Sequence, residues 1–264
     1  MSESLTETFA RLALAAGAVV MRIYGEGAQV RAKPDLSPVC DADEGAEAVI
    51  VEGLARAAPH LPIVAEEAVA RSGAPAAVAR FALVDPLDGT REFIARNGEF
   101  TVNIALIEGG APVAGVVYAP ALGALWLGDA TGAFACSVAA GADLPTPGQR
   151  RAIHVRPAPR EGAVALCSRS HGDAQTEAYL RDQHIVARRI AGSSVKFCLI
   201  AQGDADLYPR FSPTMEWDTA AGDAVLRAAG GMVATLDGAP LTYGKSGFRN
   251  SAFVARGGAS STIG

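Results

Sequence analysis

Apolar residues recur at every third or fourth position near the start of the chain. From Leu5 to Ile23 they predict an amphipathic helix of about five turns, which Gly25-Glu26-Gly27 ends. A second helix is predicted from about Asp43 to Ala58. Asp41 or Asp43 could serve simply as the cap of this helix, because aspartate is a preferred residue at that position.

Short apolar runs bounded by turn residues follow, and they predict strands. The turn signal Glu108-Gly109-Gly110 joins two of them as a hairpin. A loop or loose helix is expected at 68–80 and a helical turn at 91–96. The predicted strands are 61–65, 81–84, 100–107, 112–118 and 123–127. The first half of the chain is therefore expected to hold two helices followed by an antiparallel sheet.

The second half alternates between strand and helix patterns, which is typical of an α/β layer. The predicted helices are 174–181, 194–202 and 217–229, and the predicted strands are 163–167, 184–190, 205–208, 232–235 and 252–255. Residues 137–162 are rich in Gly, Pro, Arg and Ala without a regular period, so we interpret them as a connection. We therefore predict an α+β part at residues 1–140 and an α/β part at residues 141–264.

Composition and charge narrow the class of protein. Half of the 264 residues are apolar and 19% are charged, which is typical of a packed globular protein and not of a disordered one. The net charge of −5 and the lack of a lysine- or arginine-rich run argue against a nucleic-acid polymer as ligand. A small anionic substrate remains compatible, since bound divalent cations can reverse the local field.

The cysteines and the first residues predict a cytoplasmic location. The four cysteines have no CxxC spacing and lie beside apolar neighbours, as free thiols in a reducing compartment do. The acidic start of the chain belongs to an amphipathic helix and does not resemble a signal peptide. No apolar run approaches the ~20 residues that span a bilayer, so any membrane association is expected to be peripheral at most.

The candidate chemistry is concentrated in Asp85-Pro86-Leu87-Asp88-Gly89-Thr90, which follows the predicted strand 81–84. Two carboxylates three residues apart at a strand end can face one cleft together with the carbonyls between them. Such oxygen ligands suit Mg²⁺ better than zinc, which prefers His and Cys. The alternative is an Asp-Pro turn followed by an Asp-Gly turn, both common in loops.

Other acidic residues are also expected directly after a strand or at the start of a helix. Glu66 and Glu67 follow the preceding strand, and Asp218 is expected in the first turn of the helix 217–229. A solvated loop pair would explain the two glutamates, and a favourable charge at a helix N-terminus would explain Asp218. Their joint occurrence with the Asp85–Thr90 turn favours a shared cation site.

Together, Glu66-Glu67, Asp85–Thr90, Trp217-Asp218 and Gly230-Gly231 resemble the signature of the lithium-sensitive, magnesium-dependent phosphatases, the inositol monophosphatase superfamily. Segments 96–107, 168–171, 192–198 and 205–211 are similar to those of its CysQ-type 3′(2′),5′-bisphosphate nucleotidases. The resemblance covers nearly all of residues 5–255. It implies the alternating α-β-α-β-α layered sandwich of the sugar phosphatases. It also implies conversion of 3′-phosphoadenosine 5′-phosphate to AMP and phosphate, which clears a by-product of sulfate assimilation.

The resemblance also implies residue roles. Glu66, Asp85 and the Leu87 carbonyl would bind a first Mg²⁺, and Asp85, Asp88 and Asp218 a second. Thr90 with Glu66 would orient the attacking water, and Asp43 would be the acidic partner of Thr90. Cys40 stands where the family usually has Thr, and a thiol is the weaker hydrogen-bonding group, which puts the support of this loop in doubt.

Substrate contacts are predicted in the Asp85–Thr90 motif and in the second half of the chain. Gly192-Ser193-Ser194 opens a helix whose backbone N–H groups could bind a phosphate, although an ordinary serine cap is the alternative. Lys196, Arg210 and Arg91 could offset a second phosphate, although surface salt bridges explain them equally well. The complete predicted set of substrate contacts is Leu87, Asp88, Gly89, Thr90, Gly192, Ser193, Ser194, Lys196, Arg210 and Asp218.

The leading interpretation is a Mg²⁺-dependent phosphatase with a small phosphorylated nucleotide as substrate, two or more Mg²⁺ ions per site and no nucleic-acid polymer as partner. The alternatives are an inositol-1-phosphate or fructose-1,6-bisphosphate phosphatase with the same site, and a catalytically silent nucleotide-binding protein. Retention of every acidic ligand argues against the silent protein. A homodimer is left open.

Overall fold

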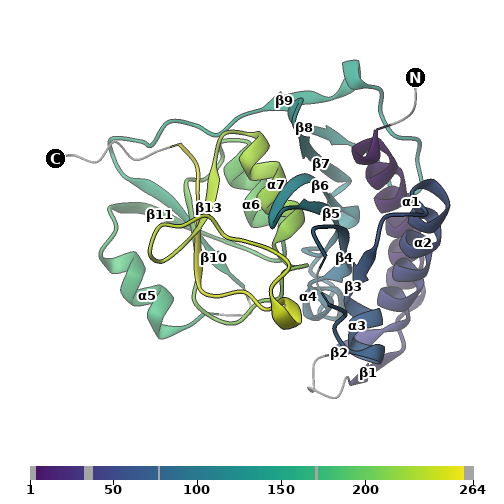
Figure 1. The fold of residues 1–264 in the computed structure, drawn as a ribbon. Helices are drawn as coiled ribbons and strands as arrows, with labels where there is room; N and C mark the ends of the chain where they lie inside the picture. The colour runs from purple at the N-terminus through teal and green to yellow at the C-terminus, as the bar shows by residue number, and fades with distance from the viewer. Residues whose placement is uncertain (1–3, 33–37, 77, 170–171, 259–264) are drawn as a thin grey trace.

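The computed structural model of the chain describes residues 4–32, 38–76, 78–169 and 172–258, which form alternating layers of helices and sheets (Figure 1). Helices α1 (Leu5–Glu26) and α2 (Asp41–Ala57) cover one face of a seven-stranded sheet. Helices α6 (Val195–Ala201) and α7 (Ala220–Ala228) lie between this sheet and a five-stranded one, and α5 (Ala174–Arg181) lies beyond it. The predicted α-β-α-β-α sandwich is confirmed.

The first sheet has the strand order β3-β4-β5-β6-β7-β8-β9. Only β3 and β4 pair in parallel, and every other neighbouring pair is antiparallel. Its strands are β3 (Ile63–Ala65), β4 (Arg80–Asp88), β5 (Thr101–Glu108), β6 (Ala111–Ala119), β7 (Ala124–Asp129), β8 (Gly132–Ser137) and β9 (Arg151–Ile153). A small separate hairpin pairs β1 (Val30–Ala32) with β2 (Pro38–Cys40).

The second sheet has the strand order β11-β10-β12-β14-β13. Strand β10 runs parallel to β11 and β12, whereas β14 is antiparallel to both its neighbours. Its strands are β10 (Ala163–Ser168), β11 (Ile185–Ala191), β12 (Leu207–Arg210), β13 (Met232–Thr235) and β14 (Phe253–Arg256). The predicted division at residue 140 stays a prediction. Strand β9 belongs to the first sheet, however, so the sheets themselves divide between β9 and β10.

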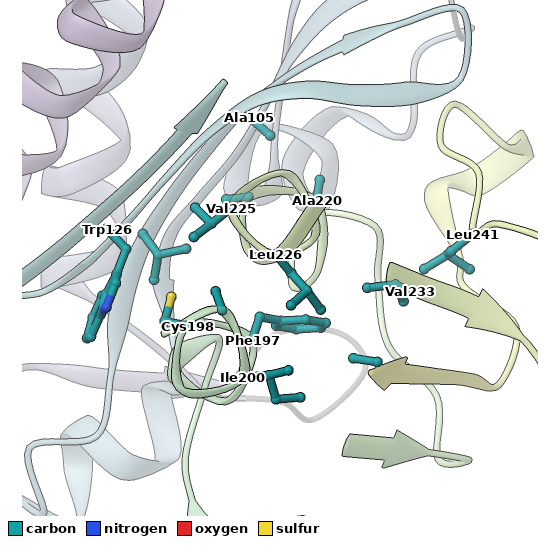
Figure 2. Packing of buried hydrophobic residues seen from close by; sticks show 14 of the residues in the cluster. Ala105, Trp126, Phe197, Cys198, Ile200, Ala220, Val225, Leu226, Val233 and Leu241 are labelled. Carbon is teal, nitrogen blue, oxygen red and sulfur yellow. The ribbon is translucent and has the colours of Figure 1, made fainter. Parts of the chain in front are cut away.

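Hydrophobic cores fill the spaces between the layers. The largest surrounds α6 and α7, where Phe197 and Ile200 of one helix and Val225 and Leu226 of the other pack between the two sheets (Figure 2). Helix α7 approaches the first sheet so closely that a Cβ atom at Gly115 would lie 2.6 Å from the carbonyl oxygen of Ala221. A second core joins α1 and α2 to the opposite face of that sheet, and a small third core lies under α5. The layers are thus held in fixed relative positions around the strand ends.

Several predicted boundaries need correction. Helix α7 begins at Ala220, so Asp218 lies in the turn before the helix and not in its first turn. Residues Glu66–Ser72 form helix α3, which starts two residues before the stretch 68–80 that was expected to be a loop or loose helix. Strands β8 and β9 were not predicted, because they are short and lack a regular alternation of apolar residues. Helix α4 (Thr90–Ile94) confirms the expected helical turn. Short 3₁₀ segments occur at Pro120–Leu122, Pro147–Gln149 and Ser246–Phe248.

Helix α1 is long and apolar enough, by length and composition alone, to span a membrane. This corrects the expectation that no segment approaches that length. The finding is weak, since a core helix of a soluble protein passes the same test. In this structure Phe9, Ala13 and Val20 of α1 are fully buried against α2 and the first sheet.

Candidate active site

A cavity of about 230 Å³ opens where the C-terminal end of β4 meets α3, α6, β12 and the turn before α7. The lining carries both carboxylates and cationic side chains. The predicted residues that line it are Glu66, Asp85, Leu87, Asp88, Gly89, Thr90, Arg91, Ser193, Lys196, Arg210 and Asp218. Asp43, Gly192 and Ser194 are not among the lining residues and act through neighbours, as the following contacts describe.

The end of β4 and the start of α4 present the central motif to the cavity, because β4 continues through Asp85 to Asp88, beyond the predicted end of this strand at Val84. Asp85 is 1% exposed, and its Oδ1 accepts a hydrogen bond of 3.1 Å from the backbone N–H of Leu87. Gly89 follows with φ of 91°, in the left-handed region that favours glycine. A Cβ atom there would lie 3.1 Å from the carbonyl oxygen of Glu99. Glycine therefore allows the chain to reverse and begin α4 at Thr90.

Thr90 is held by a buried carboxylate from α2. Its Oγ1 lies 3.0 Å from Asp43 Oδ1 and 3.3 Å from the Leu87 carbonyl oxygen, and its single proton serves one of them at a time. Burial raises the pKa of Asp43, and the hydrogen bonds from Cys40 and Thr90 oppose that rise. The predicted pairing of Asp43 with Thr90 is present in the structure.

Cys40 supports Asp43, although a thiol is a weaker hydrogen-bonding group than a hydroxyl. Its backbone N–H and its thiol both donate to Asp43 Oδ2, at 2.8 Å and 2.9 Å. Burial raises the pKa of the Cys40 thiol to about 12, and the nearby Asp43 charge adds to this, so the thiol stays protonated and remains a donor. The Cys40 thiol therefore supports Asp43 by donating a hydrogen bond, as a hydroxyl at this position would.

The remaining carboxylates surround the same cavity. Glu66 is the first residue of α3, and Asp218 Oδ2 accepts a 2.9 Å hydrogen bond from the Met215 N–H. Burial raises the pKa of Asp218 well above its usual value, and the charges of Asp88 and Glu66 raise it further. The charged form of Asp218 is therefore destabilised, a situation that a bound cation relieves.

The donor set fits a hard divalent cation, because it consists of carboxylate oxygens and a peptide carbonyl. Among the residues that the structure describes, no three His, Cys, Asp or Glu side chains are drawn together as a formed metal site. Glu66, Asp85, Asp88 and Asp218 nevertheless all line the one cavity. The residues present thus match the chemistry of Mg²⁺ binding.

Ser194 connects α6 to the motif of β4. Its Oγ lies 3.0 Å from Asp88 Oδ2 and 2.9 Å from the Asp218 carbonyl oxygen, and it accepts a 2.9 Å hydrogen bond from Asn103. The alternative of an ordinary serine cap is wrong, because this side chain makes no capping bond to its own helix. The Gly192 N–H donates to Glu99 Oε2 at 2.8 Å, so it is already bonded within the protein.

Two cationic side chains lie buried at the cavity. Lys196 is 3% and Arg210 is 7% exposed, so their interpretation as surface salt bridges is wrong. Lys196 Nζ donates to the carbonyls of Ser193 and Ala191, and Arg210 Nη1 donates to Ser168 Oγ at 3.1 Å. Burial lowers the pKa of Lys196 to about 8, the Asp88 charge opposes this, and Arg210 adds to it. A buried positive charge of this kind favours an anionic ligand.

Sequence reasoning missed several residues that line the cavity, including Glu92, Tyr208 and Thr214. Tyr208 could have been found, because residues two apart on a strand share a face and Arg210 had been singled out. Ser168 belongs to the predicted segment 168–171, whose residues 170 and 171 lie outside the described part of the chain. Thr214 carried no signal, because its place depends on contacts with a distant loop.

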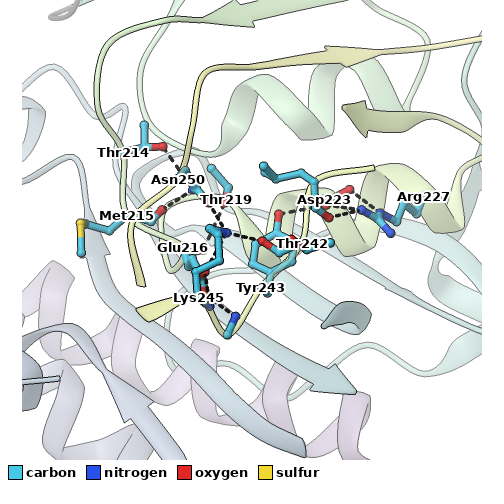
Figure 3. A network of polar contacts seen from close by, with 12 residues as sticks. Thr214, Met215, Glu216, Thr219, Asp223, Arg227, Thr242, Tyr243, Lys245 and Asn250 are labelled. Carbon is cyan, nitrogen blue, oxygen red and sulfur yellow. Dashed lines mark hydrogen bonds and ion pairs between the residues drawn. The ribbon is translucent and has the colours of Figure 1, made fainter. Parts of the chain in front are cut away.

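That distant loop, residues 242–250, holds the turn that carries Asp218 (Figure 3). The Asn250 side-chain nitrogen lies 2.8 Å from the Met215 carbonyl, 3.0 Å from Thr219 Oγ1 and 3.2 Å from Thr214 Oγ1. Glu216, which is 0% exposed, accepts bonds from the N–H groups of Gly244 and Lys245. The turn is therefore fixed from behind by a buried polar network.

We expect Asn250→Ala to lower kcat by about 10²-fold, because displacement of a positioned group by about 1 Å has an effect of that size. It should also lower the free energy of unfolding by about 1–3 kcal/mol through the buried partners left unbonded. Leu180→Ala, in the small core under α5, is the control of similar stability loss. Equal kcat values for the two variants, measured below their melting temperatures, would contradict a positioning role for Asn250.

The layered fold and a carboxylate-lined cavity at the ends of its elements define a sugar-phosphatase type of protein. The profile of the inositol monophosphatase family matches residues 1–261, and the chain belongs to this family. Its members are generally metal-dependent phosphatases.

Individual members of this family are similar to the chain in sequence and in structure. The chain is 45% identical to the 3′(2′),5′-bisphosphate nucleotidase CysQ of Shigella flexneri over 88% of this chain and 91% of that protein. The crystal structure of CysQ from Bacteroides thetaiotaomicron superposes with a TM-score of 0.82 at 37% identity, covering 97% of this chain and 98% of that one. The inositol monophosphatase of Anabaena follows with a TM-score of 0.73 at 25% identity, covering 96% and 90%.

Proposed function

We propose that the protein is a Mg²⁺-dependent 3′(2′),5′-bisphosphate nucleotidase that hydrolyses 3′-phosphoadenosine 5′-phosphate to AMP and phosphate. One observation carries the proposal: a single cavity combines the carboxylates Glu66, Asp85, Asp88 and Asp218 with the buried cations Lys196 and Arg210. A substrate with two phosphates needs both features. One phosphate is hydrolysed among the cation-binding carboxylates, while the other is neutralised by basic side chains. The 45% identity to a CysQ nucleotidase supports this choice of substrate.

In this proposal Glu66, Asp85 and the Leu87 carbonyl hold a first Mg²⁺, and Asp85, Asp88 and Asp218 hold a second. When bound, the ions supply positive charge that acidifies water and stabilises the developing charge on the phosphoryl group and the leaving oxygen. The protein's own groups orient the reactants. Thr90, fixed by Asp43, and Glu66 position the attacking water in line with the 3′-phosphate.

The leaving 3′-oxygen takes up a proton, and the water adds to phosphorus, so the balanced products are AMP and inorganic phosphate. Lys196 has three N–H donors, two of which serve carbonyls in this structure. Arg210 has five N–H donors in a planar fork, which suits phosphate oxygens, and three hydrogen bonds from this fork go to Ser168, Ser212 and Pro213. We assign these two side chains to the 5′-phosphate, and the backbone at Ser193 and Ser194 to the neighbouring part of the nucleotide.

A substrate panel tests the proposal. Initial rates of phosphate release should be measured at equal Mg²⁺ for 3′-phosphoadenosine 5′-phosphate, adenosine 3′-phosphate, inositol 1-phosphate and fructose 1,6-bisphosphate. We expect kcat/KM to be highest for the bisphosphate nucleotide, by at least about tenfold over each of the others, because only it offers a second phosphate to the buried cations in the right geometry. A tenfold preference for inositol 1-phosphate or fructose 1,6-bisphosphate would contradict the proposal. Binding without turnover of any of the four would indicate a silent nucleotide-binding protein.

We place the reaction in the cytoplasm, because all four cysteines are free thiols, as is usual in a reducing compartment. Dimerisation and a peripheral contact with a membrane remain proposals. Sedimentation of the purified protein with and without lipid vesicles tests both.

A further inference from the structure

Helix α3 begins at Glu66 without a cap of its own. Its N-cap residue is Ala65, which has no polar side chain, so the first backbone N–H groups of the helix need partners from elsewhere. Glu47 of α2 supplies them: its Oε2 accepts hydrogen bonds from the N–H of Glu67 at 2.7 Å and of Ala68 at 3.2 Å. A carboxylate from one helix thus caps the start of another.

The Glu47 carboxylate is buried, and both of its oxygens accept hydrogen bonds from α3. The residue is 3% exposed, and its second oxygen accepts a 2.7 Å ion-paired hydrogen bond from Arg71, in the last turn of α3. Arg71 itself is more than half exposed, so its share of the interaction is screened by water. The two backbone bonds, rather than the ion pair, are therefore the firm attachment.

Glu47 lies four residues after Asp43, so both side chains point from the same face of α2. Asp43 bonds Thr90 on α4, and Glu47 bonds the start of α3, which carries Glu66. The apolar side of α2, with Ala46, Ile50 and Leu54 fully buried, is fixed in the core. A single rigid helix thereby sets the positions of two groups at the cavity.

We propose that Glu47 is a positioning residue that fixes Glu66 relative to Thr90. The inference rests on the proposed function, in which Glu66 binds a cation and, with Thr90, orients the attacking water. Without Glu47, α3 would begin with two unbonded N–H groups, and Glu66 would lose its fixed approach to the cavity. Outer groups that orient a metal ligand typically contribute 10–100-fold to metal affinity.

The test compares Glu47→Ala, Glu47→Gln and Arg71→Ala. Mg²⁺ affinity is measured by calorimetry without substrate, and amide hydrogen exchange is followed at Glu67 and Ala68. We expect Glu47→Ala to exchange both amides at least about tenfold faster and to bind Mg²⁺ about 10–100-fold more weakly. Glu47→Gln keeps an acceptor oxygen and should stay within a few-fold of the wild type, as should the control Arg71→Ala. Glu47→Gln also provides the measurement at this position if the alanine variant does not fold.

Two outcomes separate this inference from the proposed function. If Glu66→Gln weakens Mg²⁺ binding but Glu47→Ala, with its amides exchanging faster, does not, the positioning role is wrong and the metal site stands. If Glu66→Gln itself leaves Mg²⁺ affinity unchanged, the proposed metal site is wrong. Unchanged amide exchange in Glu47→Ala would likewise overturn the capping role.

Discussion

Asp88→Asn is expected to lower kcat by roughly 10³-fold. Asp88 is assigned to the second Mg²⁺ alone, where charge develops on the leaving oxygen, and loss of one such stabilising group has effects of this order. Asparagine keeps the size of the side chain and an oxygen that can accept the 3.0 Å hydrogen bond from Ser194. The change therefore removes charge with little change in shape. Steady-state rates at saturating Mg²⁺ measure it.

The same variant should be at least as stable as the wild type when metal is removed. The Asp88 charge raises the pKa of Asp218, so the two carboxylates repel each other in the metal-free protein. Thermal unfolding in a chelator should thus show an equal or higher melting temperature, and added Mg²⁺ should stabilise the variant less than the wild type. Asp237→Asn, in an exposed turn, is the control for loss of one negative charge. Activity of Asp88→Asn equal to that control would refute the two-cation site.

Thr90→Ala should lower kcat by about 10²–10⁴-fold, the usual contribution of a group that handles the proton of the attacking water. The alanine variant loses the hydroxyl that lies within hydrogen-bonding distance of both Asp43 Oδ1 and the Leu87 carbonyl oxygen. KM should change less than kcat, because orienting the attacking water acts on the chemical step, whereas Thr90 is one of several predicted substrate contacts. Single-turnover rates of phosphate release separate the chemical step from product release.

Thr90→Ser is the matched control, since it keeps the hydroxyl and removes only a methyl group. Its kcat should lie within about tenfold of the wild type. If serine and alanine at this position reduce kcat equally, the hydroxyl has no part in the reaction, and Thr90 acts only by packing.

Local patterns were sufficient to predict most of the fold. The apolar run Phe81–Val84 and the hairpin turn at Glu108-Gly109-Gly110 predicted the presence of β4, β5 and β6, because a buried strand needs continuous apolar residues, but β4 continues to Asp88. Strand β8 was missed because its residues Gly132–Ser137 are mostly small and obtain their strand conformation from pairing with β7. The start of α7 was misplaced because the apolar period continues through Trp217, which is buried in the turn before the helix.

Whether a site residue could be predicted likewise depended on whether its partners are near to it or distant from it in the sequence. Residues of the Asp85–Thr90 turn were predictable because their chemistry and spacing are contiguous in sequence. Glu47 and Asn250 were not, because their partners lie 20 and 31 to 36 residues away and the contacts arise only on folding. Cys40 was judged a weak partner from its chemistry alone. Its burial, which keeps the thiol protonated, was the missing information.

Product identification tests the central claim most directly. The protein should be incubated with Mg²⁺ and 3′-phosphoadenosine 5′-phosphate, and the phosphorus resonances of substrate and products followed by NMR. We expect loss of the 3′-phosphate resonance, equal growth of inorganic phosphate, and an intact 5′-phosphate resonance belonging to AMP. No release of phosphate, or release of the 5′-phosphate to leave adenosine 3′-phosphate, would contradict the account.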